Sequence, residues 1–199
     1  LEGMAFFDLN QNGGKVNFQL HFSPICIDDK YGYDAYDLYD YPRVDGFTIL
    51  PTLLHPKSRG TVSLSSSDPK DAPIIQPNFL EEKEDLDQLV KGGELVYKLM
   101  KDEALRKHTL RDRLPFDRNS QDSLIKHIKK TLETVYHPVG TCKMGVDSMA
   151  VVDPMLKVHG ISNLRVVDAS IMPLIVSGNT NAPVYMIAEK ASDMILNNF

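Results

Sequence analysis

The sequence predicts an α+β fold in which an antiparallel sheet is covered by helices. In the first third of the chain, hydrophobic residues alternate with polar ones, which is the pattern of half-buried strands. Apolar residues then recur at helical spacing in two segments, 82–101 and 120–135. Residues 136–199 are mainly loops punctuated by proline and glycine that lead into a last helix. Strands followed by helices are typical of the α+β class.

Three segments of the first third are expected to form strands. The clearest is 15–22, in which apolar and polar residues occupy opposite faces. Segment 47–54 is rich in β-forming residues, but Pro51 limits it to a sheet edge or ends its pairing there. Segment 60–65 alternates again, and Asp- and Pro-containing clusters at 67–73 signal turns. The residues expected to face inward are Val16, Phe18, Leu20, Phe22, Val62 and Leu64.

The segment 28–42 is expected to be a loop because tyrosine and aspartate dominate it without periodicity. Its tyrosines either line a pocket or pack against one another within the loop. They are Tyr31, Tyr33, Tyr36, Tyr39 and Tyr41.

Three helices are expected after the strands. Acidic residues crowd the start of 82–101 and basic residues its end, which suits the helix dipole. Asn119 or Ser120 is expected to cap the helix over 120–135. The last helix, 183–197, begins with a proline, whose missing N–H costs nothing at that position.

The composition excludes several classes of function. The net charge is −5 and the basic residues form no stripe, so nucleic acid is not an expected partner. Apolar stretches stay well below the ~20 residues of a membrane helix, so no membrane span is expected in this chain. Cys26 and Cys142 make neither a disulfide framework nor a zinc set. The chain starts with Leu1 and shows no leader in 1–10, so we expect it to begin in mid-sequence, and its compartment is left open.

His137 is the first candidate for chemistry. Pro138 disfavours helix at the residue before it, so His137 is expected to be extended, and Gly140 allows a tight return of the chain. Imidazole titrates near neutral pH, which suits a general base. The alternative is a structural histidine without a role in chemistry.

Two further segments are candidates for ligand binding. Asp168 ends the short apolar strand expected over 164–168, where it either meets a ligand at a sheet edge or forms an Asx turn. Segment 177–183 leads into the last helix, whose first N–H groups favour anions. The alternative for that segment is simple helix capping by Asn179 or Asn181.

Several well-known motifs do not occur in the sequence. There is no G-x-G-x-x-G and no G-x-x-x-x-G-K-[ST], so the chain itself contains no dinucleotide-binding fingerprint. There is no G-x-S-x-G, which weakens a serine hydrolase interpretation, and no H-E-x-x-H for zinc. No metal site is predicted.

The candidate segments occur together in an order that resembles the C-terminal part of the glucose–methanol–choline (GMC) oxidoreductases. The similarity is strongest over 136–196 and looser over 47–69, where Leu54–Gly60 reads LHPKSRG. Within the family, the sequence resembles the insect glucose dehydrogenase-like branch, and membership of that branch is expected. The runs that carry the resemblance are HPVGTCKMG at 137–145, VVDP at 151–154, LRVVDAS at 164–170 and SGNTNAP at 177–183.

The resemblance implies a two-domain arrangement with FAD as cofactor. Residues 1–142 would be most of a substrate-binding domain, whose antiparallel sheet covers the flavin. Residues 143–199 would supply the closing strand and helix of an FAD-binding domain. The dinucleotide-binding βαβ unit of the family lies outside this chain.

The resemblance also implies roles for single residues. His137 would take the hydroxyl proton of the substrate while a hydride passes to the flavin. Asn179 would hydrogen-bond the substrate oxygen at the second active-site position. Asp168 and Ala169 would meet the ribityl and pyrophosphate of FAD, and Asn181 and Ala182 the pyrimidine edge. The complete set implied to bind FAD is Asp168, Ala169, Asn179, Thr180, Asn181 and Ala182.

The implied function is FAD-dependent oxidation of a CH–OH group in a small alcohol or sugar, with oxygen or a quinone as electron acceptor. One alternative is an enzyme like the hydroxynitrile lyases, which share this fold and keep FAD without redox turnover. Another is a fragment that is inactive alone and acts at most as a binding module. Bleaching of the flavin by substrate would distinguish the oxidation hypothesis from the lyase hypothesis.

Overall fold

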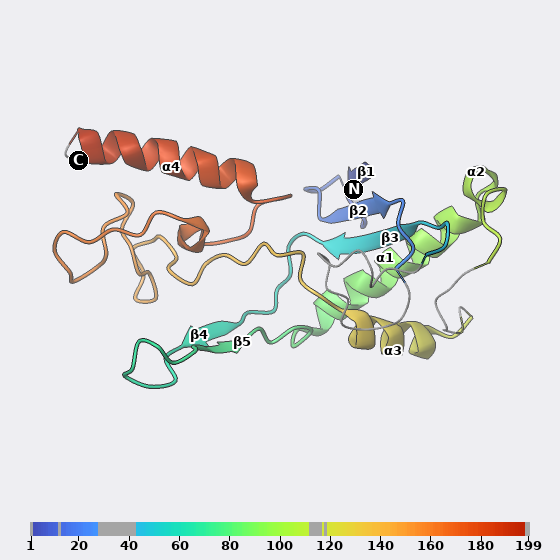
Figure 1. Cartoon of the computed structure of the whole chain (residues 1–199), viewed down its shortest axis with the longest axis horizontal. Coiled ribbons are helices and arrows are strands. Elements are labelled where there is room, and N and C mark those ends of the chain that lie inside the picture. The colour runs from blue at the N-terminus through green and yellow to red at the C-terminus, as the bar shows by residue number, and fades with distance from the viewer. Residues whose placement is uncertain (1, 12, 28–42, 112–116, 118, 198–199) are drawn as a thin grey trace. The chain divides into compact units, whose positions relative to one another are not determined.

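The computed structural model describes residues 2–11, 13–27, 43–111, 117 and 119–197. They belong to two compact units, Leu1–Ser58 with Phe79–Glu133, and Arg59–Asn78 with Thr134–Phe199. Figure 1 shows the strands and helices of each unit. The combination of antiparallel sheets and helices confirms the predicted α+β class. The tyrosine loop predicted at 28–42 lies outside the described residues.

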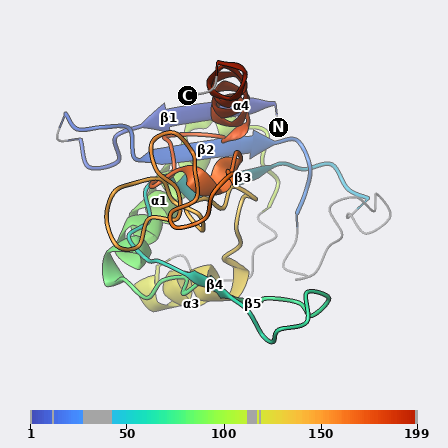
Figure 2. The same ribbon diagram turned by 90° about the vertical axis from the view of Figure 1, so that its left-hand side faces the viewer.

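The first unit contains a three-stranded antiparallel sheet. Its strands β1 (Gly3–Phe7), β2 (Phe18–Ser23) and β3 (Thr48–Leu53) lie side by side in the order β1-β2-β3 (Figures 1 and 2). Pro51 pairs with Leu20 and lies in β3, at an edge of this sheet. The prediction of an edge strand there is therefore confirmed, whereas β1 was not predicted.

The central strand β2 is buried on both faces, which corrects the expectation of a half-buried strand. Phe18 and Leu20 belong to the core, as predicted, but Gln19 and His21 are also only 2% exposed. The Gln19 side-chain amide donates to the sulfur of Met4 at 3.3 Å. Alternation predicts solvent on the polar face, and here neighbouring side chains exclude it.

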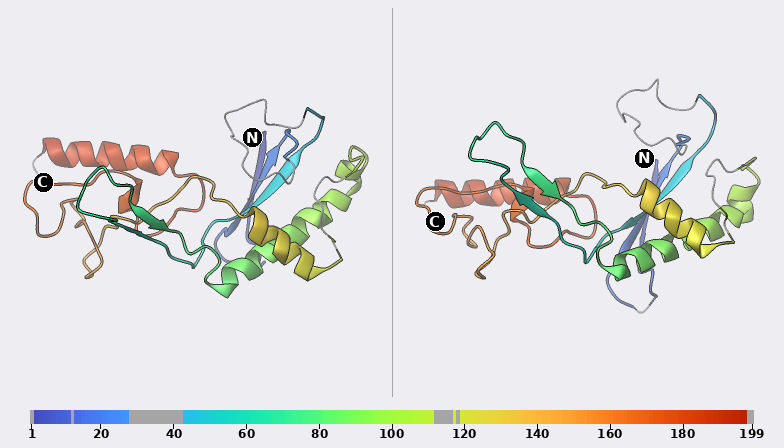
Figure 3. Two further views of the ribbon diagram at one scale, coloured as in Figure 1. Left: turned by 60° about the horizontal axis from the view of Figure 1, so that its bottom comes forward. Right: turned by 90° about the horizontal axis from the view of Figure 1, so that it is seen from below.

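Helix α1 (Lys83–Lys101) covers one face of this sheet. It contacts β3, and α3 (Gln121–Thr131) packs against α1 in turn (Figure 3). The side chains of Phe18, Leu20 and Leu89 form the centre of this core. Gly92 packs directly against the ring of Phe18, because a Cβ added at this glycine would lie only 2.2 Å from Cζ of Phe18. The helix predicted over 82–101 is confirmed.

Of the other two helices of the first unit, one differs from the prediction only at its end and one was not predicted. Helix α3 (Gln121–Thr131) starts as predicted, because the Ser120 hydroxyl accepts from the Ser123 N–H. It ends at Thr131 and not at Val135, since Leu132 already has an extended backbone. The short helix α2 (Glu103–Arg106), capped by the Asp102 side chain, was not predicted.

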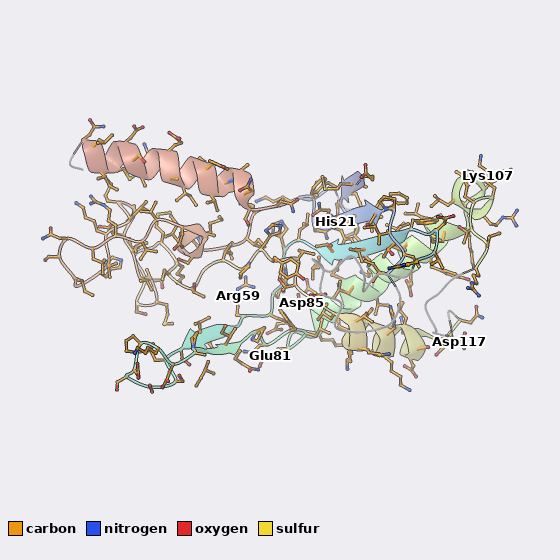
Figure 4. The ribbon with its side chains drawn as sticks, in the orientation of Figure 1. His21, Arg59, Glu81, Asp85, Lys107 and Asp117 are labelled. Atoms are coloured by element: carbon orange, nitrogen blue, oxygen red, sulfur yellow. The ribbon has the colours of Figure 1, made fainter. Side chains whose placement is uncertain are left out.

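A buried carboxylate fastens the loop after β3 to the start of α1. Asp85 is 4% exposed and lies in the first turn of α1 (Figure 4). It accepts from the backbone N–H groups of Lys57 at 2.7 Å and Ser58 at 2.8 Å, and from the Ser58 hydroxyl at 2.5 Å. The same hydroxyl oxygen accepts from the Glu82 N–H. This network fixes Lys57 and Ser58, at the end of the stretch Leu1–Ser58 of the first unit.

The second unit contains a two-stranded hairpin of β4 (Thr61–Ser63) and β5 (Ile74–Gln76). Its turn lies at the predicted Asp- and Pro-containing clusters. The prediction that Val62 and Leu64 face inward was wrong, because they are 51% and 85% exposed. Alternation marks strands that pack on a second layer, and no described residue covers these two side chains.

The rest of the second unit is built from bridged loops and helix α4 (Asn181–Leu196). The strand predicted over 164–168 is not formed, since only Arg165 makes a single bridge, to Lys157. The chain instead enters a 3₁₀ turn at Ala169–Ile171. Ile187 and Ala191 of α4 are buried in the core, whereas Ile195 is 48% exposed. The core residues are Val152, Leu156, Ile171, Met172, Ile187 and Ala191.

Candidate active site

His137 lies in a loop whose backbone is tightly specified on both sides. Tyr136 before it has a left-handed backbone with φ 63°, and Pro138 follows it. Gly140 has φ +89°, a region that favours glycine, and allows the chain to turn back. The prediction of a turning loop is therefore confirmed, and it leaves the imidazole half-buried.

Backbone hydrogen bonds tie the continuation of this loop to the 3₁₀ turn. The Cys142 N–H donates to the Ser170 carbonyl at 3.0 Å, and the Met144 N–H donates to the Ile171 carbonyl at 2.8 Å. Val139 and Met144 pack on the core of the second unit. The main chain after His137 is therefore anchored within its own unit.

The loop before α4 presents Asn179 and Thr180. Gly178 has φ 155°, and its N–H donates to the Val176 carbonyl at 2.9 Å, which makes a tight bend. Asn179 is exposed, and Thr180 is the N-cap of α4 and only 7% exposed. The alternative that Asn179 or Asn181 caps the helix was wrong, because the N-cap is Thr180.

Both nitrogens of the His137 ring meet this loop. Nε2 lies 2.8 Å from the Asn179 amide nitrogen Nδ2. Nδ1 lies 2.9 Å from the Thr180 hydroxyl oxygen. The pair His137 and Asn179, 42 residues apart in the sequence, is thus brought together. A half-buried imidazole beside an exposed amide can hold or move a proton and bind a polar oxygen.

Asp168 has a local structural partner. Its carboxylate accepts from the Ser170 N–H at 2.8 Å and from the Ser170 hydroxyl, and it caps the 3₁₀ turn. The Asx-turn interpretation is thereby confirmed. The side chain is nevertheless exposed, and Ala169 beside it is partly buried. A contact of either residue with FAD stays a prediction.

The first turn of α4 offers backbone donors. Asn181 and Ala182 are exposed, and the N–H groups at a helix start have no intrahelical acceptor. The first acceptor inside the helix, the Thr180 carbonyl, takes the Val184 N–H. Exposed donors at the positive end of a 16-residue helix fit the acceptor-rich edge of a flavin ring. The residues present therefore suit FAD.

An exposed ion pair lies just after the His137 loop. The Lys143 ammonium donates to Asp147 at 3.0 Å and, with a backbone N–H from Met149, holds the pKa of that carboxyl below its ordinary value. Since both partners are solvated, the pair adds little to stability.

Among the described residues, no group of three or more His, Cys, Asp or Glu side chains could hold a metal ion. No described helix has the length and hydrophobicity to cross a membrane.

Comparison with known proteins decides the family. The model of the GMC oxidoreductase family matches residues 56–188, which include the His137 loop and the start of α4. This chain belongs to the GMC oxidoreductase family. As a GMC oxidoreductase it belongs to a family of flavoproteins, and the predicted cofactor, FAD, is confirmed.

The relatives of this GMC chain include bacterial dehydrogenases. An alcohol dehydrogenase [acceptor] of Pseudomonas putida is 40% identical over 98% of this chain and 34% of its own length. An oxygen-dependent choline dehydrogenase of Pseudomonas savastanoi is 39% identical over 90% of this chain and 30% of its own length. The chain therefore spans about a third of the length of these curated relatives.

Solved GMC structures share the fold. Pyridoxine 4-oxidase from Mesorbium loti matches with a TM-score of 0.83 and 29% identity, over 96% of this chain and 37% of its own. A variant of formate oxidase from Aspergillus oryzae RIB40, made to study FAD modification, matches with a TM-score of 0.80 and 31% identity, over 94% and 32% of the two chains. The predicted fold class is confirmed by these likenesses.

Proposed function

We propose that this chain is the C-terminal part of an enzyme that oxidises the CH–OH group of a small alcohol with FAD, using His137 as general base. The observation that carries the proposal is the convergence of Nε2 of His137 and the amide of Asn179 at 2.8 Å. It is supported by the exposed donors at the start of α4 beside this pair. The homologues named alcohol and choline dehydrogenase support an alcohol as substrate.

In this mechanism the substrate hydroxyl displaces the direct contact between Asn179 and Nε2 of His137 and hydrogen-bonds to both side chains. The Asn179 amide donates a hydrogen bond to the substrate oxygen and orients it. Nε2 of His137 takes the hydroxyl proton, so that the oxygen can form a carbonyl as the C–H bond breaks. The chemistry that a bound FAD would supply is acceptance of the hydride that leaves the carbon. The proton ends on His137 and the electron pair would pass to the cofactor, which balances the reaction.

The same stretch of chain would hold the cofactor. Asp168 and Ala169 would contact the ribityl and pyrophosphate of FAD. The N–H groups of Asn181 and Ala182 would face the pyrimidine edge of its ring, and Asn179 and Thr180 complete the set. Donors at a helix start stabilise negative charge on that edge without any rearrangement.

The finer assignments extend the proposal. We assign residues 1–142 to the substrate-binding domain and 143–199 to the FAD-binding domain. The rest of both domains would come from the other two thirds of the complete enzyme. The substrate is an alcohol or a sugar, and oxygen or a quinone accepts the electrons. Membership of the insect glucose dehydrogenase-like branch stays a prediction.

The test uses the complete enzyme to which this chain would belong. The purified protein is mixed anaerobically with a panel of simple alcohols, choline and sugars while the flavin absorbance is recorded. We expect a yellow protein that is bleached by one class of compound, which also names the substrate. A yellow protein that no compound bleaches would contradict the oxidation and favour a lyase, and a colourless protein would contradict the assignment of FAD.

A further inference from the structure

Thr180 occupies an N-cap position without capping its helix. An N-cap threonine normally accepts a hydrogen bond from the N–H of the second or third helical residue. The third helical residue of α4 is Pro183, which has no N–H, and the Thr180 side chain makes no capping hydrogen bond. Its hydroxyl lies instead 2.9 Å from Nδ1 of His137, at a residue only 7% exposed.

With the amide nitrogen of Asn179 placed toward Nε2, the contacts of the imidazole favour one position for its proton. A neutral histidine carries one N–H and one lone pair on its two ring nitrogens. Nε2 faces the amide nitrogen of Asn179, which can only donate, so Nε2 accepts. The N–H is then on Nδ1 and donates to the Thr180 hydroxyl oxygen. If the Asn179 amide were turned round, its oxygen would accept from an N–H on Nε2. The two amide orientations therefore correspond to different tautomers, which a spectrum of the ring nitrogens can distinguish.

We propose that Thr180 is a positioning residue that holds His137 in the Nδ1–H tautomer, with the lone pair of Nε2 directed at the exposed Asn179. Without the hydroxyl, the Nδ1–H would lose the acceptor that lies 2.9 Å away in a part-buried position, and losing the partner of such a donor is costly. The ring would then rotate or move its proton to Nε2. Pro183 removes one of the two N–H groups that the hydroxyl could cap, and the hydroxyl makes no capping bond to the other, that of Ala182. The catalytic meaning of this tautomer rests on the proposed function, but the tautomer itself does not.

The direct test reads the tautomer in the full 199-residue chain. Ring ¹⁵N spectra of histidine-labelled protein are recorded at a pH high enough that the imidazole rings are neutral. The His137 signals are identified by their loss in His137→Gln. We expect Nδ1 to carry the proton in the wild type and in Thr180→Ser. In the near-isosteric Thr180→Val we expect a shift toward the Nε2–H form. A wild type already in the Nε2–H form, or an unchanged tautomer in Thr180→Val, would overturn the proposal.

A second measurement separates this inference from the proposed function. In the complete enzyme, Thr180→Val is expected to slow flavin reduction by about tenfold with little change in KM, and Thr180→Ser to restore most of the rate. If the spectra behave as expected while wild type and His137→Ala reduce their flavin equally fast, the positioning role stands and the proposed base is wrong. A Thr180→Val enzyme that loses substrate affinity and keeps its rate of reduction would overturn the positioning role.

Discussion

At the scale of single residues, the candidate site depends on how sharply the backbone bends around it. His137 lies between a left-handed Tyr136 and Pro138, and Asn179 follows the tight bend at Gly178. These constraints bring together side chains that are distant in sequence and leave few ways for the imidazole to turn. In the proposed reaction, preorganisation of this kind would let the partners that orient the ring affect the rate.

Asn179→Ala should slow substrate oxidation less than loss of the base. One neutral hydrogen bond contributes about 0.5–1.5 kcal/mol, which corresponds to about tenfold or less in rate. The measurement is kcat/KM of the complete enzyme, with the exposed Asn119→Ala as the matched control. A loss as large as that from His137→Ala would contradict the secondary role of Asn179.

At the scale of elements, α1 organises the first unit through close contacts on one side and a buried carboxylate at its start. Gly92 sits against the ring of the fully buried Phe18, and Asp85 holds the loop at 57–58. Gly93 and Asp87 lie in the same helix but do not make these two contacts, so they provide matched controls.

Gly92→Ala should lower the free energy of unfolding by about 1–3 kcal/mol, because the added methyl overlaps the Phe18 ring. Gly93→Ala should be close to neutral, since the gain in helix propensity offsets a milder contact at 3.1 Å with the flexible Leu124. Denaturant unfolding of both variants checks this prediction. Equal losses in the two variants would show that packing against Phe18 is not the cause.

Asp85→Ala should cost about 2–4 kcal/mol of unfolding free energy, because it leaves the N–H groups of Lys57 and Ser58 without their acceptor. Asp87→Ala, which removes an exposed ion pair with Lys83, should cost less than about 1 kcal/mol. Thermal unfolding followed by circular dichroism compares the two. Similar melting temperatures would contradict a structural role for Asp85.

The elements show where sequence patterns suffice and where they do not. Helices α1, α3 and α4 were predictable because one face of each is apolar at helical spacing. The burial of Gln19 and the exposure of Leu64 were not, because alternation does not reveal what packs on either face of a sheet. The prediction of a strand over 164–168 was wrong, because this apolar segment forms only one bridge, at Arg165.

The candidate site was predictable only in part. His137 and Asn179 could be named from the resemblance to the family, and the structure adds their proximity. The contact of Thr180 with Nδ1 was not foreseen, since Thr180 was expected only to contact FAD. The missing N–H of Pro183, three residues later, is the signal that could have found it.

At the scale of the whole molecule, the chain corresponds to about a third of its curated relatives. It exposes aliphatic side chains on one face of the hairpin, from Val62, its cross-strand partner Ile75, and Leu64, and we call these the hairpin cluster. Exposed apolar patches of this kind mark surfaces that bind a partner or promote aggregation. The remaining two thirds of a complete enzyme would be the natural cover for this cluster.

We therefore expect the 199-residue chain alone to bind a hydrophobic dye and to retain no FAD. Replacing two members of the hairpin cluster, in Leu64→Lys with Ile75→Lys, should reduce the dye fluorescence without changing the circular dichroism. The control is the exposed pair Lys70→Ala with Lys98→Ala, which leaves the cluster intact. Unchanged dye binding after the lysine substitutions, or stable yellow protein from the chain alone, would contradict this view.

The central claim is that His137 takes the proton during oxidation of an alcohol. The most direct test is anaerobic stopped-flow mixing of the complete enzyme with its substrate, comparing flavin reduction in the wild type and in His137→Ala. The exposed His108→Ala serves as control and should behave like the wild type. Loss of a positioned base predicts reduction about 10²–10⁴-fold slower in His137→Ala. Equal rates in the wild type and His137→Ala would contradict the claim.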